Sequence, residues 1–522
     1  MLGSETFMGL GADLNSDLQQ KLDQIATVLR SIGLTGPSVF EQLSLLMYLK
    51  MLDELESMPA GDAVLFPLQA ERFRWSNWCL MSGPSLVPFL RDEVLPYMAS
   101  LAREAPQVGE YFKDSALEIR DPGVLENVVR TIHGIDFTKL GISTTGEILE
   151  YLLSQLSGPE TEYRTPTAIR KLMVQLLDPD FAETLYDPAC GTAGFLVDAA
   201  EHIVAKYSPW PQPTSLEGDP VRQRDFDAIG DCFYANDVNR QCIRISMMNL
   251  FLHGIRNAHV KRANVLSASG GLNDDDMGRE YDVVLCNPPF AGLLPKEGIR
   301  ADLPVVSKRA DLLFLALVIR SLRRGGRCAV IVPESLLSGS AGASVDLRRK
   351  LVEDFAVRAI ISLPKQALFS TLAKVAILVF ERPKTTDHFP RSRKIWFYRI
   401  HSEEYVSRRP AQGVYQRQNE LATFPILLRK WSDFKASGFQ NPPGPEGGTD
   451  LPFHSEPSRF WWAPARLVAS SNYNLAPSRY APEVLDEIDN REPSELIGDV
   501  LRMEEDISRQ LKHVLKKVET LR

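Results

Sequence analysis

The chain has 522 residues, of which 44% are hydrophobic and 24% charged, as in ordinary globular proteins long enough to form two or three domains. Its longest apolar stretches are too short to span a bilayer and its first residues lack an export signal, so we expect a cytoplasmic protein without a membrane segment. The net charge of −8 argues against binding of nucleic acid by bulk electrostatics alone, because phosphate neutralisation requires clustered Lys and Arg.

Cysteine and histidine spacing gives no sign of a metal site. The six cysteines include no CxxC pair, and the eight histidines include no HxxxH pair. We therefore expect a reducing compartment and no structural metal. Two basic clusters, at residues 320–327 and 391–394, fit either solvated turns or phosphate sites.

The first 155 residues predict a helical domain. Apolar residues recur at helical spacing between about residues 12 and 57, with a break at Gly33 and Gly36-Pro37. Further helices are expected at 89–102, 125–131 and 147–156, and no alternating strand precedes residue 180. This pattern predicts a domain but indicates no chemistry.

A helix is expected to start shortly after Tyr163 and to run to residue 177. Thr165 fits a helix N-cap, and Pro166 fits the first helical position, where a missing N–H is tolerated. Free N–H groups at such a helix start suit a carboxylate or a phosphate, although the same residues also serve as an ordinary helix start.

A strand, a small-residue turn and a helix follow at residues 184–200. The strand ends in Asp187, and the turn carries Gly191 and Gly194 before the helix begins. This is the pattern of the first βα turn of a doubly wound sheet, in which ligands bind at the carboxyl ends of the strands. The glycines let the backbone approach a ligand, and Asp187 can pair with a cationic or hydroxyl group. A glycine turn alone specifies no particular cofactor.

Two further strand ends carry polar residues. The strand at 232–237 ends in Asp237, which can accept hydrogen bonds from ribose hydroxyls or serve as a structural cap. In the apolar helix that follows, His253 is expected to cap or pack rather than to catalyse. Asn264 then stands at the end of the third strand, where an adenine edge would lie.

The fourth strand, residues 281–286, runs into Asn287-Pro288-Pro289-Phe290. Each proline fixes φ and lacks an N–H, so the strand must end there and the backbone should be rigid. The Asn287 side-chain carbonyl and the Pro288 backbone carbonyl can converge on one planar NH2 donor, and Phe290 offers a face for stacking a flat ring. Taken alone, the stretch fits a Pro-rich turn equally well.

The alternation of strands and helices from about residue 180 to 400 predicts an α/β domain. After a helix at 310–322 and a Gly325-Gly326 turn, strands are expected at 328–333, 357–363, 373–380 and 394–398. The last two follow each other directly, which suggests an antiparallel edge. Residues 439–459 are rich in Pro and Gly and are expected to form a linker.

A terminal helix is expected from about residue 493. Its seam positions alternate between spacings of three and four, and seven of the eight are apolar, which is typical of a coiled-coil strand. These positions are Ile497, Val500, Glu504, Ile507, Leu511, Val514, Val518 and Leu521. Such a helix needs a partner, either within the chain or in another chain.

Together these motifs resemble those of the N6-adenine DNA methyltransferases, and specifically the modification (M) subunits of type I restriction-modification systems. The most specific segments are 187–192, 248–254 and 287–290, in the family's order. The helix at 43–50 and the Tyr473-Asn474-Leu475 element are also similar. The resemblance implies a Rossmann-like, SAM-dependent methyltransferase domain at 156–438. An all-helical domain at 1–155 would precede it, and the linker at 439–459 would lead to a C-terminal element at 460–522 that carries the coiled-coil-like helix.

The resemblance implies S-adenosylmethionine (SAM) as the cofactor. The helix start and the glycine turn would hold its methionine end, Asp237 its ribose and Asn264 its adenine. The residues implied in cofactor binding are Tyr163, Thr165, Pro166, Asp187, Ala189, Gly191, Thr192, Gly194, Asp237 and Asn264. Ala193 departs from a usual glycine, which is tolerable if its φ is negative, and Asn264 departs from a common Asp.

The implied reaction is methyl transfer to N6 of an adenine that is flipped out of duplex DNA. The implied catalytic residues are Asn287 and Pro288, which would grip the amine, with Pro289 and Phe290, on which the base would stack. Two alternatives stay open: a non-catalytic SAM-binding scaffold subunit, and a methyltransferase that acts on RNA or on a protein glutamine.

No sizeable DNA-recognition domain is evident after residue 400, so sequence recognition must come from a partner. The resemblance implies a specificity (S) subunit bound through the C-terminal helix, a second copy of the M subunit, duplex DNA and an optional restriction (R) subunit.

Overall fold

The computed structural model describes residues 8–57, 65–137, 165–207, 226, 228–295, 298–365, 367–368, 373–385, 394–401, 424–446 and 459–482. Tyr163, the helix predicted at 147–156 and the helix predicted from residue 493 lie outside the described residues. In the described part of the chain, no helix combines the length and apolarity that a membrane crossing requires.

The N-terminal region is helical, and no strand precedes residue 180 among the described residues, as predicted. Its elements are α1 (Met8–Ser31), α2 (Gly36–Glu56), η1 (Leu68–Phe73), α3 (Trp75–Trp78), α4 (Gly83–Phe89), η2 (Leu90–Val94), α5 (Leu95–Ser100), α6 (Pro106–Phe112) and α7 (Pro122–His133). The single helix predicted at 89–102 is interrupted by η2, a π turn. Pro96 lacks the N–H that would bond the carbonyl of Asp92, so the regular helix cannot run through this point.

The rest of the described chain is built around one nine-stranded sheet. Its strands are β1 (Leu185–Asp187), β2 (Phe233–Asp237), β3 (His259–Arg262), β4 (Tyr281–Cys286), β5 (Leu322–Pro333), β6 (Ala356–Ser362), β7 (Val375–Glu381), β8 (Lys394–Arg399) and β9 (Phe460–Pro464). The spatial order is β3-β2-β1-β4-β5-β7-β6-β8-β9, and β1 to β5 are parallel. The doubly wound α/β architecture predicted from the sequence is confirmed.

The far half of the sheet differs from the prediction. β7 and β8 do not pair with each other: β7 lies antiparallel between β5 and β6, and β8 pairs in parallel with β6. β9, which was not predicted, closes the edge in an antiparallel pairing with β8. The sheet therefore continues past the predicted linker, and Trp461 on β9 stacks at 6.0 Å on Phe397 of β8.

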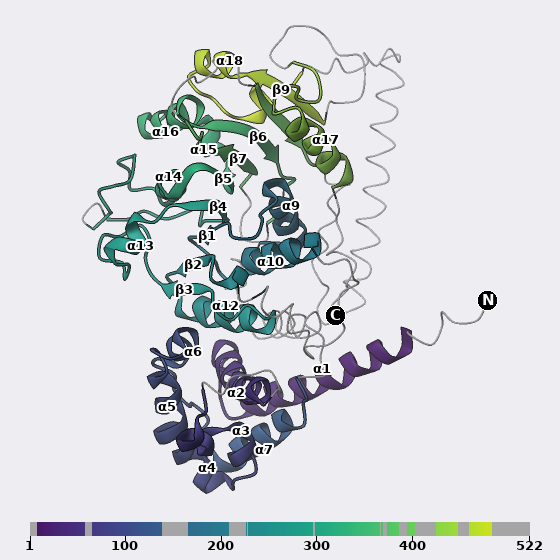
Figure 1. The fold of residues 1–522 in the computed structure, drawn as a ribbon, viewed down its shortest axis with the longest axis vertical. Helices are drawn as coiled ribbons and strands as arrows, with labels where there is room; N and C mark the ends of the chain where they lie inside the picture. The colour runs from purple at the N-terminus through teal and green to yellow at the C-terminus, as the bar shows by residue number, and fades with distance from the viewer. Residues whose placement is uncertain are drawn as a thin grey trace, which may run out of the picture.

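Helices cover both faces of the sheet. Successive strand residues point to opposite faces, and apolar residues on both faces pack against helices. On one side pack α9 (Thr167–Leu177), α10 (Gly194–Tyr207), α12 (Arg240–Leu252) and α17 (Pro425–Ala436) (Figure 1). On the other side pack α14 (Ala310–Ser321), α15 (Glu334–Ser338), α16 (Gly342–Glu353) and α18 (Ala465–Ser470), while α13 (Asp274–Gly278) and η5 (Pro477–Arg479) are short connecting elements. Along β4, Val283 and Leu285 face the first layer, and Val284 and Cys286 face the second.

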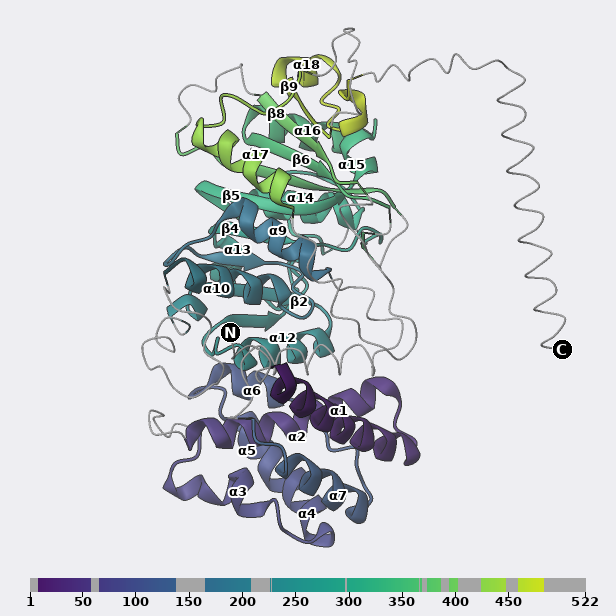
Figure 2. The same cartoon turned by 90° about the vertical axis from the view of Figure 1, so that its right-hand side faces the viewer.

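The N-terminal helices pack under α12 (Figure 2). Tyr48 of α2 meets Phe251 of α12 edge to face at 5.0 Å, and Arg244 of α12 pairs with Glu41 of α2. One continuous apolar core joins the two parts. The helices thus buttress the side of the sheet that carries α10 and α12.

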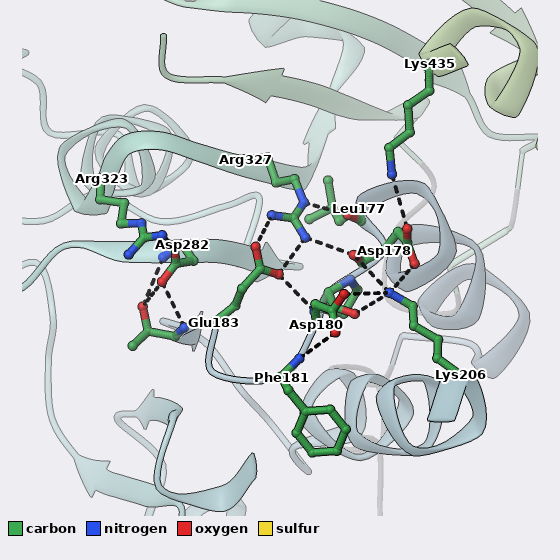
Figure 3. A network of polar contacts seen from close by, with 12 residues as sticks. Leu177, Asp178, Asp180, Phe181, Glu183, Lys206, Asp282, Arg323, Arg327 and Lys435 are labelled. Carbon is green, nitrogen blue, oxygen red and sulfur yellow. Dashed lines mark hydrogen bonds and ion pairs between the residues drawn. The ribbon is translucent and has the colours of Figure 1, made fainter. Parts of the chain in front are cut away.

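Arg327 joins β5 to the end of α9 (Figure 3). Its guanidinium pairs with both carboxylate oxygens of Glu183 at 2.7 Å and donates to the Leu177 and Asp178 carbonyls. Asp178 in turn contacts His202, Lys206 and Lys435. Burial acts to raise the pKa of Asp178, but the hydrogen bonds from these three side chains hold it below the usual range. Two other arginines of the basic cluster at 320–327 are also paired, Arg320 with Asp302 and Arg323 with Asp282. These ion pairs favour a structural role for the paired arginines over phosphate binding.

The predicted Gly325-Gly326 turn is instead part of β5. Gly326 passes so close to β4 that a Cβ there would lie 2.9 Å from the Tyr281 carbonyl oxygen. Glycine at this position lets the two strands approach each other while the chain bulges.

Replacing Arg327 with methionine is expected to lower the free energy of unfolding by about 2 kcal/mol, because it removes the guanidinium that pairs with Glu183 and donates to two helix-end carbonyls. Thermal and denaturant unfolding measure this change. The matched control is Arg324→Met, three residues away, where the side chain is exposed. Equal destabilisation by both variants would contradict the structural role of Arg327.

Candidate active site at the switch point of the sheet

The predicted functional residues gather where the strand order reverses. β1 and β4 are neighbours, with β2 outside β1 and β5 outside β4. In a doubly wound sheet this switch point opens a crevice at the carboxyl ends of the strands. Asp187 ends β1 and Asn287 directly follows β4, and the register pairs Tyr186 with Val284, so the two polar residues reach the same edge.

Asn287 presents an enclosed acceptor at this edge. Its Nδ2 donates to the Thr165 hydroxyl at 2.8 Å. Its Oδ1 is shielded from solvent and has no hydrogen-bond partner among the described residues. A buried carbonyl without a partner costs free energy, so this oxygen is suited to an N–H donor that arrives with a ligand.

The rest of the Asn-Pro-Pro-Phe segment lies partly open. Pro288 is buried, Pro289 is exposed, and Phe290 is half-buried, with part of its ring packed on the core below. The segment is neither helix nor strand, as the two prolines require. Phe290 therefore retains ring surface that a ligand can cover.

Asp187 is a second buried group without full partners. Its Oδ1 accepts the Ala189 backbone N–H at 3.1 Å, and its Oδ2 has no partner in the described part of the chain. Burial raises the pKa of Asp187 to about 8, against the opposing Ala189 N–H. A cation at Oδ2 would restore the charged form, so the site fits a ligand that carries an ammonium or hydroxyl group.

The turn after β1 differs from the prediction at two positions. Gly191 has φ of +53°, as a glycine there allows, but Ala193 has φ of +59°, so the condition under which alanine would be tolerated, a negative φ, is not met. Ala193 therefore carries roughly 1 kcal/mol of backbone strain. Gly194 approaches Arg170 rather than open space, since a Cβ at this position would lie 2.6 Å from the Arg170 Nε.

Two side chains of helix α12 donate hydrogen bonds to the turn after β1. Asn249 Nδ2 donates to the Thr192 carbonyl, and Ser246 Oγ donates to the Gly191 carbonyl, each at 2.7 Å. The segment 248–254 was noted only as a family motif, and its sequence did not reveal this bracing. His253 ends α12, with its ring nitrogen 2.8 Å from the Asn249 carbonyl, and packs as predicted.

Replacing Asn249 with alanine is expected to raise the dissociation constant for SAM, the cofactor that the sequence resemblance implies, about tenfold, because the turn loses one of its two hydrogen bonds from α12. Isothermal titration calorimetry measures this change. Asn257→Ala, at an exposed site in the loop after α12, is the matched control and should bind as the wild type does. Unchanged affinity in Asn249→Ala would show that the turn keeps its shape without the brace.

Asp237 links two turns at the same edge. One carboxylate oxygen accepts the Gly191 N–H at 3.1 Å, and the other accepts the Asn239 N–H at 2.7 Å. Burial raises the pKa of Asp237, while these backbone donors act in the opposite direction. Asp237 thus does cap the loops, and each oxygen keeps a second lone pair for a ligand hydroxyl.

Asn264 and the helix start complete the edge. Asn264 lies half-buried after β3, and its Oδ1 accepts the Leu266 N–H at 3.2 Å. The predicted N-cap is displaced by one residue: Pro166 is the N-cap of α9, and Thr165 precedes it. The Thr165 hydroxyl bonds Asn287 instead of capping the helix.

Two residues that the sequence analysis did not select support this site. Arg170 of α9 donates from Nε to Asp198 of α10 at 2.7 Å and from Nη1 to the Thr165 carbonyl at 2.9 Å. Both side chains are buried. Arg170 and Asp198 each stand among apolar residues in the sequence of their helix. This pattern could have predicted that they pair, because buried charges require partners.

A pocket of about 430 Å³ lies at the opposite edge of the sheet. Its lining includes Glu280, just before β4 begins, and Arg382, just after β7 ends, and these two residues pair at 2.8 Å. The pocket lies by the amino end of β4, whereas the switch-point residues lie at the carboxyl ends of β1 and β4, so the pocket takes no part in the site.

A family model described as N-6 DNA Methylase matches residues 141–486, which is more than half of the chain. The chain belongs to the N-6 DNA methylase family. The predicted family and the predicted fold are thereby confirmed, and the switch-point residues lie within the matched region.

Curated relatives of this N-6 DNA methylase include subunits of type I restriction enzymes. The EcoEI methylase subunit of Escherichia coli is 29% identical over 378 residues, or 68% of this chain and 72% of that protein. The StySPI methylase subunit of Salmonella potsdam is 27% identical, over 70% of this chain and 68% of its own length. A solved chain of the type I R-M system has the same fold, with a TM-score of 0.64 over 97% of this chain and 99% of its own, at 23% identity.

Proposed function

We propose that this N-6 DNA methylase transfers a methyl group from SAM to N6 of an adenine in duplex DNA, as the modification subunit of a type I-like complex. The observation that carries the proposal is the enclosed Asn287 Oδ1, which has no partner and lies at the switch point. Such an acceptor requires a hydrogen-bond donor, and the adenine amine supplies one.

The cofactor fits the residues present. The unpartnered Asp187 oxygen would accept a hydrogen bond from the ammonium group of SAM. Asp237 would accept hydrogen bonds from its ribose hydroxyls, and Asn264 would bond the edge of its adenine. The bound cofactor supplies an electrophilic methyl group on sulfur. Thr165, Pro166, Ala189, Gly191, Thr192 and Gly194 form or support the surrounding turns, and Tyr163 stays a prediction.

The target base would have to leave the duplex to reach this crevice, because an amine paired inside DNA cannot approach a buried edge. Phe290 would stack on the flipped base. The Asn287 Oδ1 and the Pro288 carbonyl would each accept a hydrogen bond from its N6 amino group. These acceptors draw the nitrogen toward tetrahedral geometry and stabilise its developing positive charge. With SAM bound, the N6 lone pair would form the new bond to the methyl carbon, the electrons of the broken carbon–sulfur bond would stay with sulfur, and one N6 proton would be released.

Sequence recognition would come from an S subunit, with a second M copy and an optional R subunit in the complex. Two observations support this assembly. Relatives of similar length are methylase subunits of type I enzymes, and the described elements after residue 400, α17, β9 and α18, pack on the sheet instead of forming a recognition domain. The apolar seam predicted from the sequence for a C-terminal helix would offer the S subunit a binding surface.

Co-expression with a candidate S subunit in a host without adenine methylation tests this proposal. Single-molecule sequencing of host DNA should reveal N6-methyladenine at one defined motif, and neither subunit alone should produce it. A complex that binds SAM and DNA yet leaves the host DNA unmodified would support the scaffold alternative.

A further inference from the structure

The bond between Thr165 and Asn287 joins two motifs that are 122 residues apart. Thr165 lies two residues before α9, and Asn287 follows β4. We propose that Thr165 is a positioning residue: by accepting from Asn287 Nδ2, its hydroxyl holds the amide so that Oδ1 faces the target amine. This inference rests on the proposed function and gives Thr165 a role beyond the cofactor.

The orientation of the amide decides whether the grip works. An adenine amine is a donor, so it needs the Asn287 oxygen and would be opposed by the Asn287 NH2 group. The observed arrangement places NH2 on Thr165 at 2.8 Å and leaves Oδ1 enclosed and available. If the Asn287 amide were rotated by half a turn, its NH2 group would face the adenine NH2 group, and two donors cannot form a hydrogen bond with each other. The Thr165 hydroxyl acts as acceptor in this bond and keeps its own proton for a second partner.

Thr165 is itself held from behind. Arg170 Nη1 donates to the Thr165 carbonyl at 2.9 Å, and Arg170 Nε pairs with Asp198 of α10 at 2.7 Å. Gly194 leaves room for this guanidinium, because any Cβ at 194 would lie within 2.9 Å of three Arg170 side-chain atoms. The start of α10, directly after the glycine turn, thereby holds Arg170 through Gly194 and Asp198, and Arg170 in turn holds Thr165, which orients Asn287.

The test uses three variants of the full chain in complex with its S subunit. Thr165→Val keeps the shape but removes the acceptor, and we expect kcat to fall about tenfold to a hundredfold, because a mobile amide is often misplaced. Thr165→Ser keeps the hydroxyl and should restore most of the rate. Thr167→Val removes a hydroxyl that contacts Arg170 at 3.3 Å but not Asn287, and it should change kcat at most about threefold.

Cofactor affinity separates positioning from binding. Calorimetry should show that Thr165→Val raises the SAM dissociation constant by a much smaller factor than it lowers kcat, since Thr165 is one of several residues at the cofactor edge and Asp187 and the turn are unaltered. A Thr165→Val variant with wild-type kcat, or one that loses SAM affinity in proportion to its rate, would overturn the inference. A wild-type complex that methylates no adenine would refute the proposed function instead.

Discussion

Replacing Asn287 with alanine is expected to lower kcat for adenine methylation by at least about a hundredfold while leaving SAM affinity unchanged. The side chain supplies the enclosed Oδ1, which has no partner within the described chain, and preorganised groups of this kind typically contribute a factor of about 10² to 10³ to kcat. Steady-state methylation assays and calorimetry on the purified complex measure the two quantities.

The stability of the Asn287→Ala variant distinguishes a catalytic role from a structural one. Alanine removes a buried carbonyl that costs free energy in the unliganded chain, and it also removes the bond to Thr165. The two effects oppose each other, so the melting temperature should change little. A large loss of melting temperature together with the loss of activity would mean that Asn287 acts mainly in the fold.

Replacing Asp187 with asparagine is expected to weaken SAM binding by about a hundredfold and to stabilise the cofactor-free protein at neutral pH. Asparagine cannot form the charge-assisted hydrogen bond to an ammonium group, and bonds of this kind contribute about 1.5 to 3 kcal/mol. Calorimetry measures the affinity, and thermal unfolding without SAM measures the stability. A variant that bound SAM normally would exclude Asp187 from the cofactor site.

The gain in stability has a defined pH dependence. The folded pKa of Asp187 is about 8, whereas an unfolded aspartate titrates near 4, so between these values the unfolded chain binds fewer protons. The contribution of Asp187 to wild-type stability should therefore fall as pH rises from about 4 to 8. Asp187→Asn should remove this slope and gain on the order of a few kcal/mol at pH 8. Parallel stability curves for the two proteins would contradict a raised pKa.

The sequence predicted those parts of the site that depend on local chemistry. A strand that ends in an acid, a glycine turn and a double proline each restrict the backbone within a few residues, and all three lie where they were expected. Because parallel strands share one carboxyl edge, Asp187 and Asn287 could be placed together from the strand pattern alone.

The parts that were missed depend on packing between distant segments. Arg170 and Asp198 take their role from the contact of α9 with α10, and Asn249 takes its role from the contact of α12 with a turn 57 residues earlier. The insertion of β7 between β5 and β6 is likewise a choice of long-range pairing, which its apolar sequence allows in several positions. The φ of Ala193 is imposed by the turn against the local preference of alanine.

The central claim is that this crevice delivers a methyl group to N6 of adenine in DNA, and isotope transfer tests it most directly. The complex of the chain with its S subunit is incubated with SAM that carries a deuterated methyl group and with duplex DNA that contains the recognition motif. Mass spectrometry of the digested nucleosides should find the label in N6-methyl-2′-deoxyadenosine from the wild-type complex and little or none from the Asn287→Ala complex. Label in cytosine, in RNA or in protein, or equal label from both complexes, would contradict the account.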